Sequence, residues 1–181
     1  IIGAGTMGNG IAQVCALAGL SVTLIDVSQA ALDKGLATLT GSLDRLVKKD
    51  KLTAADKEAA LARIRATTAY EDLRDAQLVI EAATENLELK LRILRQIEAV
   101  VGPQAVIASN TSSISITQLA AVLQHPQRCV GMHFFNPVPL MALVEIIRGL
   151  QTSDATHAAV KDLAERLGKT PITVKNAPGF V

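Results

Sequence analysis

The chain has 181 residues, enough for one ordinary domain with a sizeable buried core. Apolar residues make up 49% and charged residues 19% of the sequence, a balance that excludes a disordered chain. A net charge of +1 and only 2% aromatic residues argue against a nucleic-acid partner, and no apolar run approaches the ~20 residues of a membrane span.

Apolar runs of strand length alternate with helical patterns along the chain. We expect a strand stub at 1–2, a helix at 7–20, a strand at 21–26, and helices at 28–51 and 53–64. A buried strand at 76–83, a helix at 87–101, a strand at 105–109 and a helix at 114–123 come next. Strands at 128–135 and 140–147, a helix at 153–167 and a strand at 171–175 complete the chain.

This alternation predicts an α/β fold with a doubly wound sheet that is parallel over most of its width. The strands at 128–135 and 140–147 are joined by a short connection containing Pro137 and Pro139, too short for a helical crossover. We therefore expect an antiparallel strand on the C-terminal side of the sheet. Cys15 and Cys129 have no paired spacing, which favours free thiols and a cytoplasmic location.

The stretch GAGTMG, residues 3–8, has the G-x-G-x-x-G spacing of dinucleotide-binding loops. It follows a strand stub and opens a helix, and Asp26 ends the next strand 18 residues after Gly8. Gly3 allows a tight turn, Gly5 lets the backbone approach a pyrophosphate, and Gly8 permits close helix packing. Asp26 would accept hydrogen bonds from the ribose and repel a 2′-phosphate, which predicts NAD over NADP. The alternative is that these glycines serve only a turn.

Polar clusters follow three of the expected strands: residues 84–86, residues 109–113, and His133 with Asn136. Each lies at the carboxyl end of its strand, which is the edge where open α/β sheets bind ligands. The alternative for the second cluster is that its last serines, Ser112 or Ser113, cap the helix at 114.

The stretch 131–147 is almost entirely apolar, yet it contains His133, Asn136 and Glu145. A lone His on an apolar strand is more often structural, but the PVP turn returns the chain and can bring Glu145 beside His133. A carboxylate on one ring nitrogen fixes the tautomer and makes the other nitrogen more basic. Since the reference pKa of His is ~6.5, this pair suits a general base. We therefore expect oxidation of a secondary alcohol, with the hydride passing to NAD.

At these residues the sequence resembles the 3-hydroxyacyl-CoA dehydrogenase family, specifically its NAD-binding domain. The similar stretches are IGAGTMGNGIAQ, ATEN, ASNTSSISIT, HFFNPVPLMALVEII and the closing APGFV, in the family's order. Short bacterial 3-hydroxybutyryl-CoA dehydrogenases are the nearest type. The resemblance implies a Rossmann-type fold, NAD as cofactor and an acyl-CoA substrate.

The resemblance also implies roles for individual residues. His133 would be the base and Glu145 its partner, Ser112 would hold the substrate oxygen, and Asn136 would contact substrate or nicotinamide. The implied NAD contacts are Gly3, Gly5, Thr6, Met7, Gly8, Asp26, Ala83, Thr84, Glu85 and Lys90, together with Ser112 and Asn136. Ser42 and Lys49 are similar to the family's CoA contacts, although the run KKDK can equally be a solvated helix face.

The family continues past PGFV into an all-helical domain that dimerises and closes the acyl site. We therefore expect residues 1–181 to be the NAD-binding domain with a truncated first strand and without that C-terminal domain, the full protein being a homodimer. The alternatives are another β-hydroxyacid dehydrogenase, which would need a catalytic Lys, and a non-catalytic crystallin-like NAD-binding protein.

Overall fold

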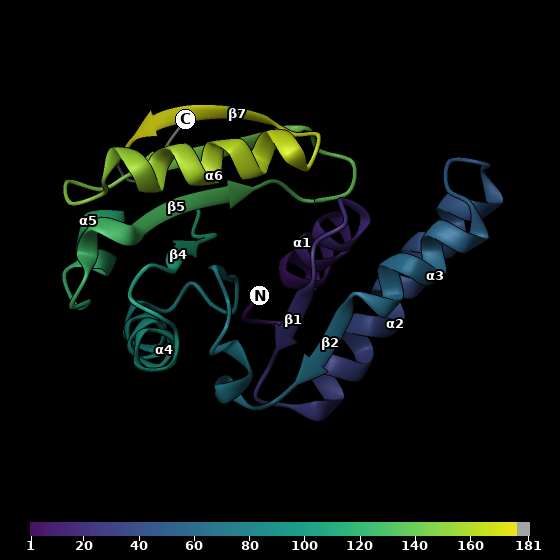
Figure 1. Cartoon of the computed structure of the whole chain (residues 1–181), viewed down its shortest axis with the longest axis horizontal. Coiled ribbons are helices and arrows are strands. Elements are labelled where there is room, and N and C mark those ends of the chain that lie inside the picture. Colours follow the sequence, from purple (N-terminus) through teal and green to yellow (C-terminus); the bar gives the residue numbers. More distant parts are fainter. Residues whose placement is uncertain (177–181) are drawn as a thin grey trace.

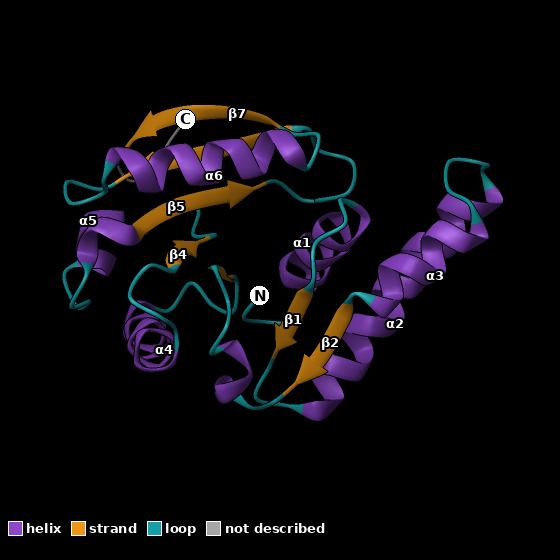
Figure 2. Ribbon diagram, viewed as in Figure 1, coloured by secondary structure: helices purple, strands orange, loops and turns teal. Residues whose placement is uncertain are grey.

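The computed structural model describes residues 1–176, and helices and strands alternate along this part of the chain as the sequence predicts (Figures 1 and 2). The strands are β1 (Val22–Ile25), β2 (Ile64–Thr67), β3 (Leu78–Glu81), β4 (Val106–Ser109), β5 (Cys129–Phe134), β6 (Leu143–Arg148) and β7 (Thr170–Lys175). The α-helices are α1 (Thr6–Leu17), α2 (Gln29–Lys48), α3 (Ala54–Ala62), α4 (Leu87–Val100), α5 (Ile116–Ala120) and α6 (Asp154–Arg166). Short 3₁₀ turns are η1 (Tyr70–Leu73) and η2 (Pro126–Arg128).

The strands form a mostly parallel sheet whose two parts meet at the start of the chain. Strands β3, β4 and β5 run parallel, β5 and β6 are antiparallel, and β7 is parallel to β6. On the other side β1 pairs with β2 in parallel. Ile2 bridges Ile25 of β1 and Glu81 of β3, so the chain start joins the two parts. The strand order reverses at this point, and such reversals are where doubly wound sheets bind ligands.

Helices cover both faces of the sheet. One buried cluster joins α1, α2, α3 and α6 to one face and includes Ile11, Leu43 and Val160. A second cluster joins α4 and α5 to the opposite face and includes Leu94 and Leu119. Beyond β2, helices α2 and α3 extend away from the sheet (Figure 1). This arrangement confirms the predicted doubly wound α/β fold with an antiparallel strand on its C-terminal side.

The clearest departures from the predicted elements are a missed strand, a missed turn and two elements with other bounds. The strand β2 and the turn η1 were not expected, because IRAT at the sheet edge is only half-buried and has no apolar run. The expected strand at 140–147 begins only at Leu143, after a turn in which Leu140 N–H donates to Pro137 O. The expected helix at 114–123 shortens to α5, which begins after the cap Ser115.

Glu98 of α4 ties this helix to the segment that leads into β5. Its carboxylate accepts hydrogen bonds from the backbone N–H groups of Gln124 (2.7 Å) and His125 (3.1 Å) and from the Arg128 guanidinium (3.2 Å). Burial on its own raises the pKa of Glu98, but these donors outweigh burial, so the pKa lies below its usual value. The cluster is therefore a pH-dependent stabilising contact of the fold.

Cys15 and Cys129 are both buried and free, as the sequence predicts. Burial raises the pKa of Cys15 to about 11 and that of Cys129 to about 12, so neither thiol is reactive in the folded protein. Within residues 1–176, no helix is both long enough and apolar enough to cross a membrane.

Candidate active site

The glycine loop after Ile2 packs so tightly that two of its glycines cannot carry a side chain. Gly3 has φ +101°, and a Cβ there would lie 2.8 Å from the carbonyl oxygen of Ala82. A Cβ on Gly8 would lie 1.7 Å from the Gly3 carbonyl oxygen. Gly5 is different, because a Cβ there would meet nothing within 4 Å. The loop is therefore pressed against the end of β3, while its Gly5 face is open to a ligand.

The first turn of α1, which contains Thr6 and Met7, offers free donors. Helices α2 to α6 each begin at a side chain that accepts a hydrogen bond from the first turn: Ser28, Thr53, Asn86, Ser115 and Ser153. Helix α1 begins at Gly5 without such a cap. The first backbone N–H groups of a helix and its positive dipole end attract phosphate. The glycine loop and this helix start thus fit the diphosphate of a dinucleotide.

Asp26 lies at the end of β1 beside the glycine loop. One carboxylate oxygen accepts from Ala4 N–H (3.0 Å) and the other from Ser28 N–H (3.2 Å). These bonds orient the carboxylate, and a carboxylate has further lone pairs for ribose hydroxyls. Two cavities of about 330 and 350 Å³ flank Asp26, and Gly3, Asp26 and Ala83 line both. The site therefore has room for a nucleotide on either side of the carboxylate that was predicted to bind the ribose hydroxyls.

His133 and Glu145 form the predicted pair. The antiparallel register of β5 and β6 sets these two residues directly opposite each other, and His133 Nδ1 lies 3.0 Å from Glu145 Oε1. Glu145 is only 1% exposed, while the His133 side chain keeps 15% of its surface exposed. The Phe135 ring lies beside the imidazole, with ring centroids 4.6 Å apart and the ring planes tilted by 49°. A buried carboxylate thus holds an imidazole that can still reach a ligand.

The segment after β4 is tied to β5 at the residue that follows His133. Asn110 Oδ1 accepts from the backbone N–H of Phe134, next to His133, at 2.8 Å. Thr111, Ser112 and Ser113 all direct their hydroxyls to one oxygen of Glu85. The alternative that Ser112 or Ser113 caps the following helix is wrong, because Ser115 accepts from Gln118 N–H at the start of α5.

The loop after β3 is held by its own side chains. Ala83 N–H donates to Glu81 (2.8 Å), and Thr84 Oγ1 accepts from Asn86 N–H (3.0 Å). Asn86 in turn caps α4. The loop therefore presents Glu85 toward the Ser-rich segment after β4.

Lys90 was predicted to contact NAD, but its side chain is buried with 1% exposed surface. Its ammonium forms an ion pair with Glu81 and donates to Ser109 Oγ at 3.2 Å. Ser109 Oγ also donates to Glu81 at 2.9 Å, and Glu85 lies 4.0 Å from the same ammonium. Glu81 was not among the predicted polar groups, and Ser109 was expected only as the first residue of the polar cluster at 109–113. A Glu in the apolar run AQLVIEAA was the signal that could have revealed this buried cluster.

Within residues 1–176, no hydrogen bond links the remaining predicted residues, Asn136, Ser42 and Lys49, to the site residues described above. Asn136 is exposed just beyond β5. Ser42 lies within α2 and Lys49 at its C-terminal end, about two turns apart, and Lys49 is exposed. The stretch APGFV lies outside the described residues.

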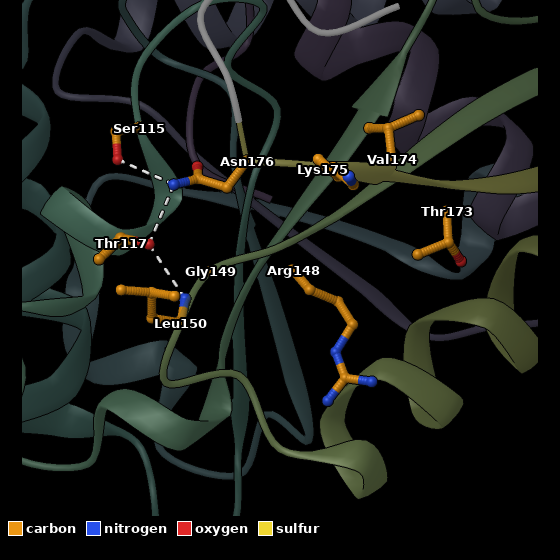
Figure 3. Close-up of a pocket in the computed structure, with 9 residues that line it drawn as sticks. All are labelled: Ser115, Thr117, Arg148, Gly149, Leu150, Thr173, Val174, Lys175 and Asn176. Carbon is orange, nitrogen blue, oxygen red and sulfur yellow. Dashed lines mark hydrogen bonds between the residues drawn. The ribbon is translucent and has the colours of Figure 1, made fainter.

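A larger cavity of about 680 Å³ lies elsewhere, between the start of α5 and the ends of β6 and β7 (Figure 3). There the Asn176 amide donates to Ser115 Oγ (3.1 Å) and Thr117 Oγ1 (2.9 Å), and Leu150 N–H donates to Thr117 Oγ1 (3.0 Å). None of the predicted site residues lines it. Arg148 and its neighbours in this cavity lie toward the amino end of β5, whereas His133 lies toward the carboxyl end.

Comparison with known proteins agrees with this geometry. The family described as 3-hydroxyacyl-CoA dehydrogenase, NAD binding domain, matches residues 1–177. The chain belongs to this family. A 3-hydroxybutyryl-CoA dehydrogenase of Bradyrhizobium diazoefficiens is 51% identical over all 181 residues, which cover 62% of that relative. The alpha subunit of a fatty acid oxidation complex of Acinetobacter baylyi is 46% identical over 181 residues, and the chain covers 25% of it.

Solved structures give the same result. The crystal structure of an (S)-3-hydroxybutyryl-CoA dehydrogenase from Ralstonia eutropha superimposes with a TM-score of 0.98 at 66% identity, over 100% of this chain and 64% of that one. The chain thus spans less than two thirds of the length of these dehydrogenases.

Proposed function

We propose that the full protein oxidises (S)-3-hydroxyacyl-CoA thioesters, with 3-hydroxybutyryl-CoA as substrate, to 3-oxoacyl-CoA and catalyses the reverse reaction, in fatty acid or butyrate metabolism. The observation that carries this proposal is the His133–Glu145 pair at 3.0 Å, at the carboxyl end of a strand in a dinucleotide-binding sheet. The names of the relatives support the same chemistry.

In this proposal His133 takes the proton of the 3-hydroxyl group during oxidation and returns it during reduction. Glu145 accepts from Nδ1, which leaves the proton exchange to Nε2, and its charge stabilises the imidazolium that forms. Ser112 binds the substrate oxygen, and Asn136 contacts substrate or nicotinamide. NAD, when bound, supplies the acceptor for the hydride that leaves C3. The glycine loop, Asp26 and the 83–85 loop hold it.

We also propose the finer assignments that the family resemblance implies. Ser42 and Lys49 contact the CoA moiety, Lys49 through a phosphate. The full protein works in the cytoplasm as a homodimer. These proposals do not alter the chemistry assigned to His133, so they can fail separately.

The decisive experiment is reduction of acetoacetyl-CoA by the full-length protein, followed as loss of NADH absorbance. We expect turnover in the wild type. We expect the His133→Gln variant to bind NADH normally, while its kcat falls about 10²–10⁴-fold because general acid–base catalysis is lost. Light scattering of the same sample measures the oligomeric state. A wild-type protein that binds NADH but never reduces acetoacetyl-CoA would reject the proposed substrate class.

A further inference from the structure

Glu85 connects the two halves of the proposed active site through a single oxygen atom. It follows β3 on the cofactor side, yet its Oε2 accepts the hydroxyls of Thr111 (3.0 Å), Ser113 (3.2 Å) and Ser112 (3.4 Å) from the segment after β4. Its side chain is 50% exposed, so ligand hydroxyls can reach the carboxylate as well.

The three donors compete for this oxygen. All three donors draw on the charge and lone pairs of one oxygen, so each of them weakens the hydrogen bonds that the other two make. Hydrogen-bond energy falls as the distance grows beyond ~2.8 Å for O–H donors. Ser112 has the longest of the three contacts, so its hydroxyl is the one that another acceptor withdraws most easily. Ser112 is also the residue proposed to bind the substrate oxygen.

The Glu85 carboxylate also has a contact at its other oxygen, with a buried lysine. Its Oε1 lies 4.0 Å from the ammonium of Lys90, whose side chain is 1% exposed and bonded to Glu81 and Ser109. Thr111 is fixed as well, because its Oγ1 accepts the backbone N–H of Ile114 at 3.0 Å. Glu85 therefore has contacts at both oxygens, Lys90 at one and the three hydroxyls at the other, and a ligand that approaches it redistributes these contacts.

We propose that Glu85 is a positioning residue that couples acyl-CoA binding to NAD binding through Ser112. When a substrate carbonyl draws the Ser112 hydroxyl away, Oε2 loses one donor and becomes a better acceptor for a hydroxyl of the dinucleotide ribose. The converse holds too, since binding coupling is reciprocal. This inference rests on the proposed function and adds to it positive cooperativity between the two ligands.

The test measures the affinity of the full-length protein for NAD⁺ by calorimetry, with and without saturating acetoacetyl-CoA, two oxidised ligands that cannot react with each other. We expect acetoacetyl-CoA to tighten NAD⁺ binding about three- to tenfold, the effect of about one net hydrogen bond. The ratio of the NAD⁺ affinities with and without acetoacetyl-CoA should fall to one in Ser112→Ala, which has no hydroxyl to withdraw, and in Glu85→Ala.

Ser113→Ala is the matched control, because it removes a donor from the same oxygen without touching the proposed substrate contact, and it should keep the cooperativity. Equal NAD⁺ affinities in the wild type with and without acetoacetyl-CoA would overturn the inference, as would full cooperativity in Ser112→Ala. If Glu85→Ala binds NAD⁺ too weakly to measure, the Ser112→Ala result alone decides. Failure of the wild type to reduce acetoacetyl-CoA with NADH would instead reject the proposed function.

Discussion

Replacing Glu145 by Gln tests how much the buried carboxylate contributes to catalysis. Gln has nearly the same volume, and its amide oxygen can still accept from His133 Nδ1, so the change removes the charge and keeps the shape. With charge centres ~4 Å apart and an effective dielectric constant of ~20, the lost attraction for an imidazolium is about 4 kcal/mol. Because ~1.36 kcal/mol of barrier is tenfold in rate, kcat should fall about 10³-fold.

The assay is steady-state reduction of acetoacetyl-CoA by the full-length protein, with NADH affinity measured separately and expected to stay unchanged. Glu98→Gln is the matched control, since Glu98 is also a glutamate in an ion pair, partly buried and 3.2 Å from Arg128, but lies away from the site. That control should lower stability and leave kcat at the wild-type value. Wild-type kcat in Glu145→Gln at every pH would show that His133 works without the carboxylate.

Three further variants test other parts of the structure. Asp26→Ala should weaken NADH binding and narrow the preference over NADPH, because it removes the ribose acceptor and the charge that repels a 2′-phosphate; unchanged cofactor discrimination in binding titrations would contradict this. Lys49→Glu should raise KM for acyl-CoA far more than KM for a pantetheine thioester, which lacks the CoA phosphate. Equal effects on the two KM values would show that Lys49 belongs to a solvated helix face and does not contact CoA. Glu98→Gln should lower the free energy of unfolding by about 1–3 kcal/mol at neutral pH. Since the pKa of Glu98 is lower in the folded protein, this difference should be present above the unfolded-state pKa of ~4.3 and shrink as the pH falls below it; a pH-independent difference in urea titrations would refute it.

The local geometry of the glycine loop and of Asp26 could be predicted from the sequence because each signal there is local. A glycine that must have positive φ, an uncapped helix start and an acidic strand end all lie within residues 3–26. The pairing of His133 with Glu145 was also predictable, since a short proline-containing turn forces two neighbouring strands to run antiparallel.

The buried cluster of Glu81, Lys90 and Ser109 was not predictable in the same way. Its members come from β3, α4 and β4, and their contact depends on how a helix sits on two strands. A buried charge without a partner is costly, so Glu81 within an apolar strand signals that a cation must lie nearby. Nothing in the local pattern tells which of several cations on the following helix is that partner. The short strand β2 was not predicted for a related reason, because a half-buried edge strand has no apolar run in its sequence.

The apolar stretch around His133 shows how a core strand can also carry catalytic groups. Side chains along a strand alternate between its two faces, and Met132 and Phe134 join the cluster under α1 and α6. His133 therefore points to the opposite face, where Gly131, two positions earlier, leaves room for Ile116 of α5. A slip of β5 by one residue would turn His133 toward the apolar cluster, away from Glu145, and would expel Met132 and Phe134 from that cluster. Burying the imidazole there and leaving the buried Glu145 without this partner costs several kcal/mol, so the packing of the apolar residues is what fixes the geometry of the polar ones.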